Sequence, residues 1–387
     1  MRRLKLILPF LGLSLLLTAC WDIKSLQDVN YFTGIGIDYS DNTYKVYVQQ
    51  LDFASVAKSE GGGKSDKPAT VWIGSAEGKS ISQAIVELYQ TTQQTVFWGH
   101  LNAIVLSEST LKHGELLGVI DSLIRYPEIR YTPWVYGTKA DISDLFTTKP
   151  FFNLSPINSI LHSPETNYNQ RPIIAPMRLS QFIREMREPG QTALLPSLNV
   201  SDKTWKRNEK PDPKLEIDGI FAIRNVGYTS WVNDKELLGI RWLVNKSQGS
   251  RITLNQGDQT IAELKLAKPK SKVRVDMVNG APVFKVGIKV SAAIIELWEM
   301  RSEADLEQLA GQLIAEQVRT ALRVGINKKV DLLNLEHDFY RKKYNDWNKL
   351  TSAGKSPLLP INLGEVKVSV KIVQSGMYKF KRKMTPY

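Results

Sequence analysis

The sequence contains almost no cysteine and, after its first twenty residues, no long apolar run. Cys20 is the only cysteine in 387 residues, so no disulfide can form within the chain. No later stretch reaches the roughly eighteen consecutive apolar residues of a transmembrane helix. These absences exclude a disulfide-stapled domain and predict no membrane-spanning helix beyond the N-terminal segment.

The N-terminal segment has the layout of an export signal. A cationic head, MRRLK, precedes twelve uncharged, mostly aliphatic residues, and the segment ends in the letters LTAC at positions 17–20. The apolar run is too short to cross a bilayer core of about 30 Å. The LTAC pattern resembles the lipobox of bacterial lipoproteins. That resemblance implies cleavage between Ala19 and Cys20 and a diacylglyceryl group on the Cys20 sulfur.

A cysteine suits this anchoring role for chemical reasons. The thiolate is a strong nucleophile that can accept a lipid in a thioether bond. Two acyl chains give stable membrane anchoring, because each buried methylene contributes about 0.8 kcal/mol. The alternative is an ordinary buried cysteine that happens to follow an apolar segment. The charged head, the core length and the LTAC pattern together favour a signal peptide over residues 1–19 and a lipid anchor at Cys20.

The composition predicts a folded, basic, multi-domain protein. Removal of residues 1–19 lowers the formal net charge from +12 to +9, and 42% of the residues are hydrophobic. Chains of this length usually form two or three domains. A basic exported protein suits anionic lipid head groups or wall polymers, whereas nucleic acid is not expected outside the cytoplasm. The basic run KFKRK at 379–383 is either a solvated tail or a patch that contacts a membrane or a partner.

Residues 20–148 predict a mixed α/β domain. The stretch 31–53 reads as a β-hairpin whose turn lies at Asp41-Asn42, since both residues tolerate left-handed backbone geometry. Beyond a Gly-rich polar loop, apolar periodicity then predicts alternating helices and strands. The expected elements are a strand near 71–78, a helix at 80–92, a buried strand at 96–108, a helix at 114–129 and a strand and turn at 131–146.

Residues 149–213 have a different composition, because they are rich in proline. Nine of the eighteen prolines fall in this stretch. One helix, roughly 180–188, is bracketed by Pro176 and Pro189. Because proline removes backbone donors and ends helices, we expect a lightly structured connecting region.

Residues 214–387 predict an α+β domain, with a further division near residue 265 as an alternative. A hairpin over 215–232, an alternating strand at 284–290 and a final strand at 366–372 surround two helical stretches, 302–325 and 330–350. This order predicts an antiparallel sheet packed with two long helices. The whole chain is therefore expected to be a multi-domain α+β protein.

No residue pattern predicts catalysis, a metal or a cofactor. Gly63-Lys64-Ser65 lacks the upstream glycine of a phosphate-binding loop. Asp218 and Glu263 are lone acids without an evident second carboxylate. The histidines lack metal-ligand spacing and a cysteine partner; they are His100, His113, His162 and His337.

Three segments in order resemble the Ger(x)C family, the lipoprotein C subunits of nutrient germinant receptors in spore-forming bacteria. They are CWDIKSLQDVNYFTGIGIDYSDNTYKVYVQQ from Cys20, GIFAIRNVGYTSWVNDKELLGIRWL from Gly219, and VDLLNLEHDFYRKKYNDWNKL with LPINLGEVKVSVKIVQSG from Val330. The resemblance spans nearly the whole mature chain. One departure is Leu332-Leu333-Asn334-Leu335, where family members often have a Gly-rich run.

The resemblance implies a fold and a role. The fold would be three α+β domains joined by short linkers, without known catalysis. The protein would lie on the outer surface of the spore inner membrane, held by the anchor on Cys20. It would assemble with integral-membrane A-type and B-type subunits into a receptor for amino acids, sugars or nucleosides. Of the family's functional residues, only Cys20 is carried over.

Two alternatives stay open from the sequence. A solute-binding lipoprotein of an uptake system would have two α/β lobes around a cleft, which the Pro-rich middle and α+β end do not favour. A wall-active enzyme would need a carboxylate pair or a zinc site, and the sequence indicates neither. The ligand-binding residues of a receptor subunit are not indicated by any pattern.

Overall fold

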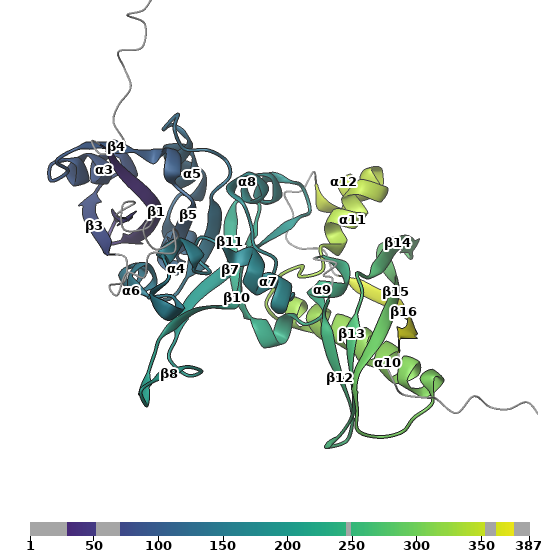
Figure 1. Ribbon diagram of the computed structural model, residues 1–387. Helices are drawn as coiled ribbons and strands as arrows, with labels where there is room; N and C mark the ends of the chain where they lie inside the picture. The colour runs from purple at the N-terminus through teal and green to yellow at the C-terminus, as the bar shows by residue number, and fades with distance from the viewer. Residues whose placement is uncertain (1–28, 52–69, 245–248, 353–360, 375–387) are drawn as a thin grey trace, which may run out of the picture.

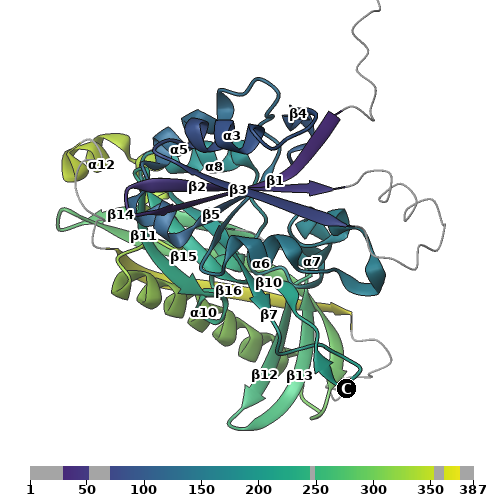
Figure 2. The ribbon, with the colours of Figure 1, turned by 90° about the vertical axis from the view of Figure 1, so that its left-hand side faces the viewer.

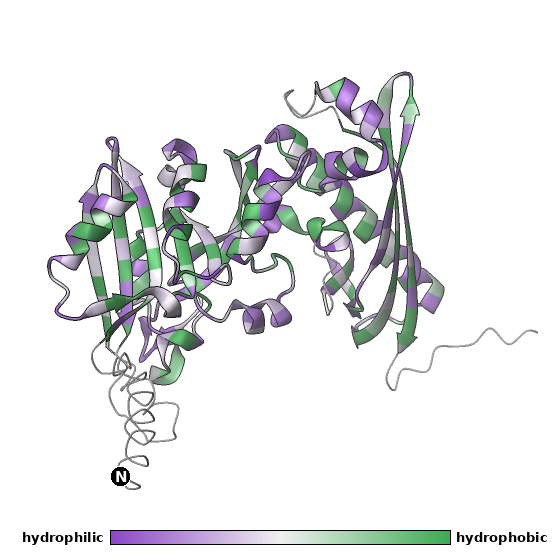
Figure 3. Cartoon of the chain, turned by 90° about the horizontal axis from the view of Figure 1, so that it is seen from above, coloured by the Kyte–Doolittle hydropathy of each residue, from purple (hydrophilic) through white to green (hydrophobic). Residues whose placement is uncertain are grey.

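The computed structural model describes residues 29–51, 70–244, 249–352 and 361–374. Within them, two β-sheets stand at opposite ends of an elongated molecule, with helices between them (Figures 1 and 3). The first sheet and its helices form what we call the first unit, and the second sheet with its helices forms the second unit. Helices and strands occur in both units, so the predicted α+β, multi-domain class is confirmed.

The first sheet contains nine strands of the described residues, in the order β11-β10-β7-β6-β5-β1-β2-β3, with β4 beside β1. Its centre, β7-β6-β5-β1, is parallel, and both flanks are antiparallel. The strands are β1 (Val29–Ser40), β2 (Thr43–Leu51), β3 (Val71–Gly78), β4 (Thr95–Phe97), β5 (Ala103–Ser107), β6 (Trp134–Thr138), β7 (Thr192–Ser201), β10 (Lys214–Arg224) and β11 (Gly227–Asn233). A short hairpin, β8 (Lys206–Arg207) and β9 (Lys210–Pro211), projects beyond the sheet (Figure 1).

Helices cover both faces of this sheet (Figure 2). One face carries α3 (Ile81–Tyr89), α4 (Glu108–His113), α5 (Leu116–Ile124) and α8 (Leu179–Arg187). The other face carries α6 (Ile142–Thr147) and α7 (Pro164–Gln170). The layered arrangement buries the central strands on both sides, and β5 is correspondingly a run of apolar residues.

Local sequence explains the hairpin and the first helix. Asp41 and Asn42 have φ values of 50° and 57°, so the predicted turn between β1 and β2 is confirmed. Ser80 accepts a hydrogen bond from the Gln83 N–H and caps α3.

The predicted strand over 96–108 is interrupted. The structure has β4, then a 3-10 turn at Trp98–His100, then β5. The Trp98 N–H donates to Glu128 Oε2 at 2.9 Å, and the Trp98 ring is buried. Burial of this indole takes the chain out of the sheet for one turn, a tertiary effect that strand periodicity does not encode.

The proline-rich stretch is more regular than its composition predicts. It holds 3-10 turns at Phe151–Asn153 and Pro156–Asn158, then α7, α8 and β7. β7 pairs with β10 over ten residue pairs and lies inside the first sheet. Its Pro196 is tolerated because β7 pairs with β6 only at Gly137 with Ser197, which leaves few ladder bonds for a proline to remove on that side.

The second sheet has five described strands, in the order β12-β13-β15-β14 with β16 on β15. They are β12 (Arg251–Gln256), β13 (Gln259–Leu266), β14 (Lys270–Val278), β15 (Ala281–Leu297) and β16 (Asn362–Gln374). β16 is parallel to β15, so the sheet is mixed and not wholly antiparallel as predicted. The chain between them crosses over through α10 (Glu303–Asn327), and such a crossover returns the next strand in parallel.

The second predicted long helix is two short ones, α11 (Leu335–Lys342) and α12 (Tyr344–Thr351). Lys343 between them has φ −140° and ψ 57°, outside helical geometry. The break directs Trp347 back onto α11, where its indole donates to Glu336 Oε1 at 3.3 Å.

The first sheet continues past residue 213, where the C-terminal domain was expected to begin. β10 and β11 complete its edge, although they follow that boundary in sequence. Ile220 and Ala222 on β10 belong to the core of the second unit, whereas Phe221 and Ile223 on the same strand belong to the first. Alternate residues of one strand therefore serve two cores.

Candidate functional site

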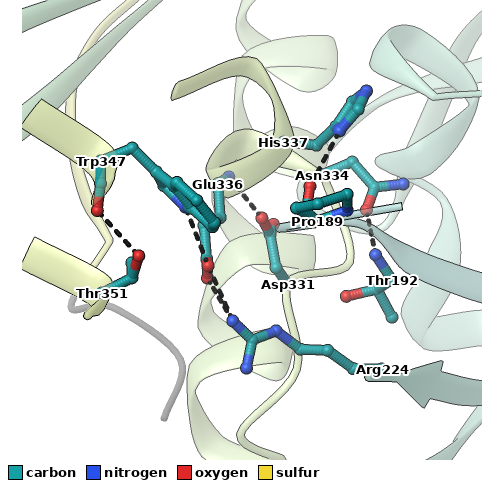
Figure 4. Close-up of polar contacts among 9 residues, drawn as sticks. All are labelled: Pro189, Thr192, Arg224, Asp331, Asn334, Glu336, His337, Trp347 and Thr351. Carbon is teal, nitrogen blue, oxygen red and sulfur yellow. Dashed lines mark hydrogen bonds and ion pairs between the residues drawn. The ribbon is translucent and has the colours of Figure 1, made fainter. Parts of the chain in front are cut away.

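The two units meet at a cluster of polar contacts that we call the junction. The first unit contributes Pro189 in the turn before β7, Thr192 at the start of β7, and Arg224 at the end of β10 (Figure 4). The second unit contributes residues 331–347, which lead into α11 and on to α12. The polar contacts of the junction link the two units and help to fix how they are placed.

A buried ion pair lies at its centre. Arg224 Nη2 donates to Glu336 Oε1 at 2.7 Å and Oε2 at 2.8 Å. The Glu336 side chain is fully buried and that of Arg224 is 10% exposed. The Trp347 indole donates to the same carboxylate. Charges held in this way are strongly coupled, because removing one leaves the other buried without a counter-ion.

Asp331 organises the backbone that carries Glu336. Its Oδ2 accepts from the Glu336 N–H at 2.7 Å and its Oδ1 from the Leu333 N–H at 3.2 Å. Burial raises the pKa of Asp331 to about 6, although the backbone donors act in the opposite direction. The side chain therefore caps the turn that leads into α11.

Asn334 and Gly190 bring the two backbones into contact. Asn334 has φ 54°, a left-handed conformation that asparagine tolerates better than most residues, and it lies where the Gly-rich run of the family was expected. Its Oδ1 accepts from the Thr192 N–H at 2.8 Å. Gly190 has φ 69°, and a Cβ there would lie 3.2 Å from the Glu336 carbonyl. His337 Nδ1 donates to the Pro189 carbonyl at 3.3 Å.

The sequence-predicted site residues are dispersed. Ala19 and Cys20, like Gly63-Lys64-Ser65 and the run 379–383, lie outside the described residues. His337 alone of the histidines joins the junction. Asp218 is half-buried on β10, where burial raises its pKa, and Glu263 pairs with Arg251 at 3.5 Å on the second sheet. The structure therefore does not bring these acids and histidines together.

The other histidines have structural surroundings. His100 packs edge-on against Tyr31 with ring centroids 4.8 Å apart, and His113 is exposed in the last turn of α4. His162 is fully buried, and its Nε2 donates to Gln49 Oε1 at 2.8 Å. Burial lowers the pKa of His162 to about 4, which keeps the ring neutral at physiological pH.

The described ranges contain neither a cluster of metal ligands nor a helix that could span a membrane. Across them, no three His, Cys, Asp or Glu side chains lie close enough to hold a metal ion. Likewise, none of the described helices is both long and apolar enough to cross a membrane.

Sequence reasoning did not identify the junction residues. Arg224 and Glu336 are 112 positions apart, and neither belongs to a spacing motif. The available signal is a charged residue inside an apolar run, as in the letters FAIR before Asn225 and VDLLNLE from Val330. Such residues are exceptions to the rule that charges stay exposed.

Comparison with known proteins agrees with the earlier resemblance along the chain. Residues 22–200 match the family model described as spore germination protein N-terminal domain, and residues 218–376 match that described as spore germination B3/GerAC like, C-terminal. The first match ends within β7 and the second begins within β10.

Individual relatives cover nearly the full length. The chain is 25% identical to spore germination protein KC of Bacillus subtilis (strain 168), over 94% of this chain and 93% of the relative. It is 24% identical to spore germination protein B3 of the same organism, over 87% and 91%. The crystal structure of the GerBC protein has a similar fold, with a TM-score of 0.53 and 18% identity over 88% of this chain and 97% of that one. With both domain models matched in order, the chain belongs to the Ger(x)C family of spore germination proteins.

Proposed function

We propose that this chain is the lipid-anchored C subunit of a nutrient germinant receptor, needed for spore germination in response to small nutrients. The observation that carries the proposal is the match of both domains, in order, to spore germination proteins. The protein acts on the outer surface of the spore inner membrane. It works through assembly with integral-membrane subunits of the A and B types.

The anchor supplies the membrane attachment. The LTAC pattern at 17–20 supports lipidation of Cys20, the only thiol of the chain. An anchored protein is confined to a plane, which raises its effective concentration near membrane partners without a large intrinsic affinity. This explains how a subunit with no expected membrane span of its own can join a receptor of integral-membrane proteins.

The role is non-catalytic. The acids and histidines considered as catalytic candidates have separate positions and structural contacts, such as His162 with Gln49 and Glu263 with Arg251. The junction in turn supports a positioning role for the two units. The alternative of a solute-binding lipoprotein gains no support, because the second unit is a mixed sheet with a crossover helix and not a second α/β lobe.

Deletion of the gene tests the proposal. Spores without it are challenged with panels of amino acids, sugars and nucleosides, and the loss of optical density is followed, with calcium dipicolinate as a receptor-independent trigger. We expect failure on one nutrient class with a normal dipicolinate response. A Cys20→Ala allele is expected to leave the inner-membrane fraction and to reproduce that failure. Normal germination on every nutrient in a strain lacking the other receptors would contradict the proposal.

A further inference from the structure

Three large aromatic side chains are exposed at one edge of the first sheet. Trp72 is 64% exposed, Tyr131 51% and Phe97 38%. They come from β3, from the chain just before β6, and from β4. Exposed aromatic side chains that line up on one side of a molecule indicate a contact surface more strongly than single ones do.

The strand register brings two of them to one level. Trp72 on β3 pairs with Gln50 on β2, and Gln50 pairs with Phe32 on β1. Phe97 on β4 pairs with Tyr31, the neighbour of Phe32. The Phe97 and Tyr31 rings also pack edge-on, with centroids 6.0 Å apart. Trp72 and Phe97 therefore lie at neighbouring levels of the sheet, close to the start of β1, with β1 and β2 between their strands.

Tyr131 lies at the same edge, in the chain that leads into the start of β6. Gly34 pairs with Ala103, and Ala103 pairs with Trp134. Tyr131 precedes Trp134 by three residues, as Tyr31 precedes Gly34. With strands about 4.8 Å apart, the three aromatic residues span roughly 20 Å along the edge where β1, β5 and β6 begin. We call this the strand-start edge.

The described chain begins at this edge. Val29 is the first residue of β1, and Figure 2 shows β4 beside the beginning of that strand. Only residues 21–28 separate Val29 from Cys20. Nine residue steps span at most about 30 Å, so a lipid on Cys20 keeps the strand-start edge close to the bilayer.

We propose that the strand-start edge rests on the bilayer surface, with Trp72, Phe97 and Tyr131 in the interfacial layer. Tryptophan and tyrosine favour this layer because one part of each ring system is apolar and another is polar. The exposed neighbours of Tyr131, Glu128 and Arg130, have opposite charges, so this pair adds no net negative charge that anionic lipids would repel. This inference rests on the lipid anchor of the proposed function.

Another exposed tryptophan provides a matched control. Trp298 is 55% exposed and follows β15, in the second sheet. It belongs to the other unit and is remote in sequence from the anchor. If exposed tryptophans in general met the membrane, Trp298 would behave as Trp72 does.

Site-directed spin labelling of the lipidated full chain in vesicles of phosphatidylcholine and phosphatidylglycerol tests the proposal. A lipid on Cys20 blocks the only native thiol, so a label reports only on a new cysteine. The variants are Trp72→Cys, Phe97→Cys, Tyr131→Cys and the control Trp298→Cys. We expect the ratio of oxygen to nickel-chelate collision rates to rise several-fold at the three edge positions relative to position 298.

The outcomes separate this inference from the anchor itself. If the chain does not float with the vesicles, and mass spectrometry shows unmodified Cys20, the anchor and this inference both fail. A second outcome is that the chain floats, but the three edge labels collide with oxygen and with the nickel chelate as the label at position 298 does. The anchor would then be supported, and the proposed contact between the strand-start edge and the bilayer would be wrong. Labels shielded from both reagents would show contact between protein copies and would also overturn the inference.

Discussion

Arg224 and Glu336 link the two units of this chain through a charged contact. Their ion pair is buried, doubly hydrogen-bonded and supported by the Trp347 indole. The proposed anchor at Cys20 has a local signal in the sequence, because four adjacent residues form its pattern. The sequence could not predict this pair, because the partners are 112 positions apart and a charge inside an apolar run does not indicate which residue it pairs with.

Replacement of Glu336 should lower the stability of the folded protein. Glu336→Ala leaves Arg224 buried without a counter-ion, and we expect the free energy of unfolding to fall by about 3–5 kcal/mol. Urea denaturation measures the change. The matched control is Glu263→Ala, whose partner Arg251 is 62% exposed, and it should cost less than about 1 kcal/mol. Equal losses in the two variants would show that the junction pair is not a stabilising contact.

The buried His162 predicts an acid-sensitive stability. Its pKa is lowered to about 4 in the folded chain, whereas an unfolded histidine titrates near 6.5. As the pH falls from about 6.5 to 4, the unfolded state gains a proton that the folded state does not. The contribution of His162 to the free energy of unfolding should therefore fall by about 3 kcal/mol over this interval.

A variant isolates that contribution. His162→Gln keeps a side-chain donor for Gln49 but cannot titrate, so its urea midpoint should change less between pH 7 and pH 4.5 than that of the native chain. The comparison cancels Asp331, whose pKa is raised to about 6 by burial and whose effect has the opposite sign. Parallel pH profiles for the two proteins would rule out His162 as the source.

At the scale of elements, apolar periodicity predicted most helices and strands, including β1, β2, α3, β15 and α10. The departures occur where a tertiary contact overrides the local pattern. Trp98 is buried and divides one expected strand into β4 and β5. The break at Lys343 divides one expected helix into α11 and α12. β7 forms despite Pro196, because its main partner is β10.

The packing of α10 depends on a glycine beside it. A Cβ on Gly239 would lie 2.2 Å from the Gln317 carbonyl oxygen on α10 and 2.7 Å from Ala321 Cβ. Gly239→Ala must therefore displace α10, and we expect a loss of about 1–3 kcal/mol in unfolding free energy.

Gly227→Ala is the matched control for that substitution. The nearest atom to a Cβ at Gly227 is the Arg224 carbonyl oxygen at 3.6 Å, an ordinary contact distance. We expect a change within about 0.5 kcal/mol. Thermal melts measure the stability of both variants. An unchanged melting temperature for Gly239→Ala would mean that α10 can shift without loss of stability, which would contradict the prediction.

At the scale of the whole molecule, the two units share a strand and are not independent. β10 supplies Phe221 and Ile223 to one core and Ile220 and Ala222 to the other. The sequence placed a boundary at residue 213 because prolines end there. In the structure the first sheet continues past residue 213, because β10 pairs with β7. The proline content of the sequence does not indicate this pairing.

A shared strand predicts cooperative unfolding. Loss of either core exposes one face of β10, which destabilises the other core. We therefore expect one calorimetric transition for the full chain, with the calorimetric and van't Hoff enthalpies in agreement. Two resolved transitions, or a protease-resistant fragment that ends near residue 213, would show that the units unfold separately.

The shared strand also has a consequence for how the protein is made. If the chain is exported as proposed, its N-terminal part leaves the translocon first, so β10 and β11 are released before the helix α10 that covers part of the second core. During that interval the first sheet can close, but the back of β10, with Ile220, Ala222 and Val232 on β11, has no cover. Each newly exported copy would pass through a stage with an apolar surface open to water. Slow translocation would prolong that stage, so the yield of this protein should depend on export rate and on extracytoplasmic chaperones.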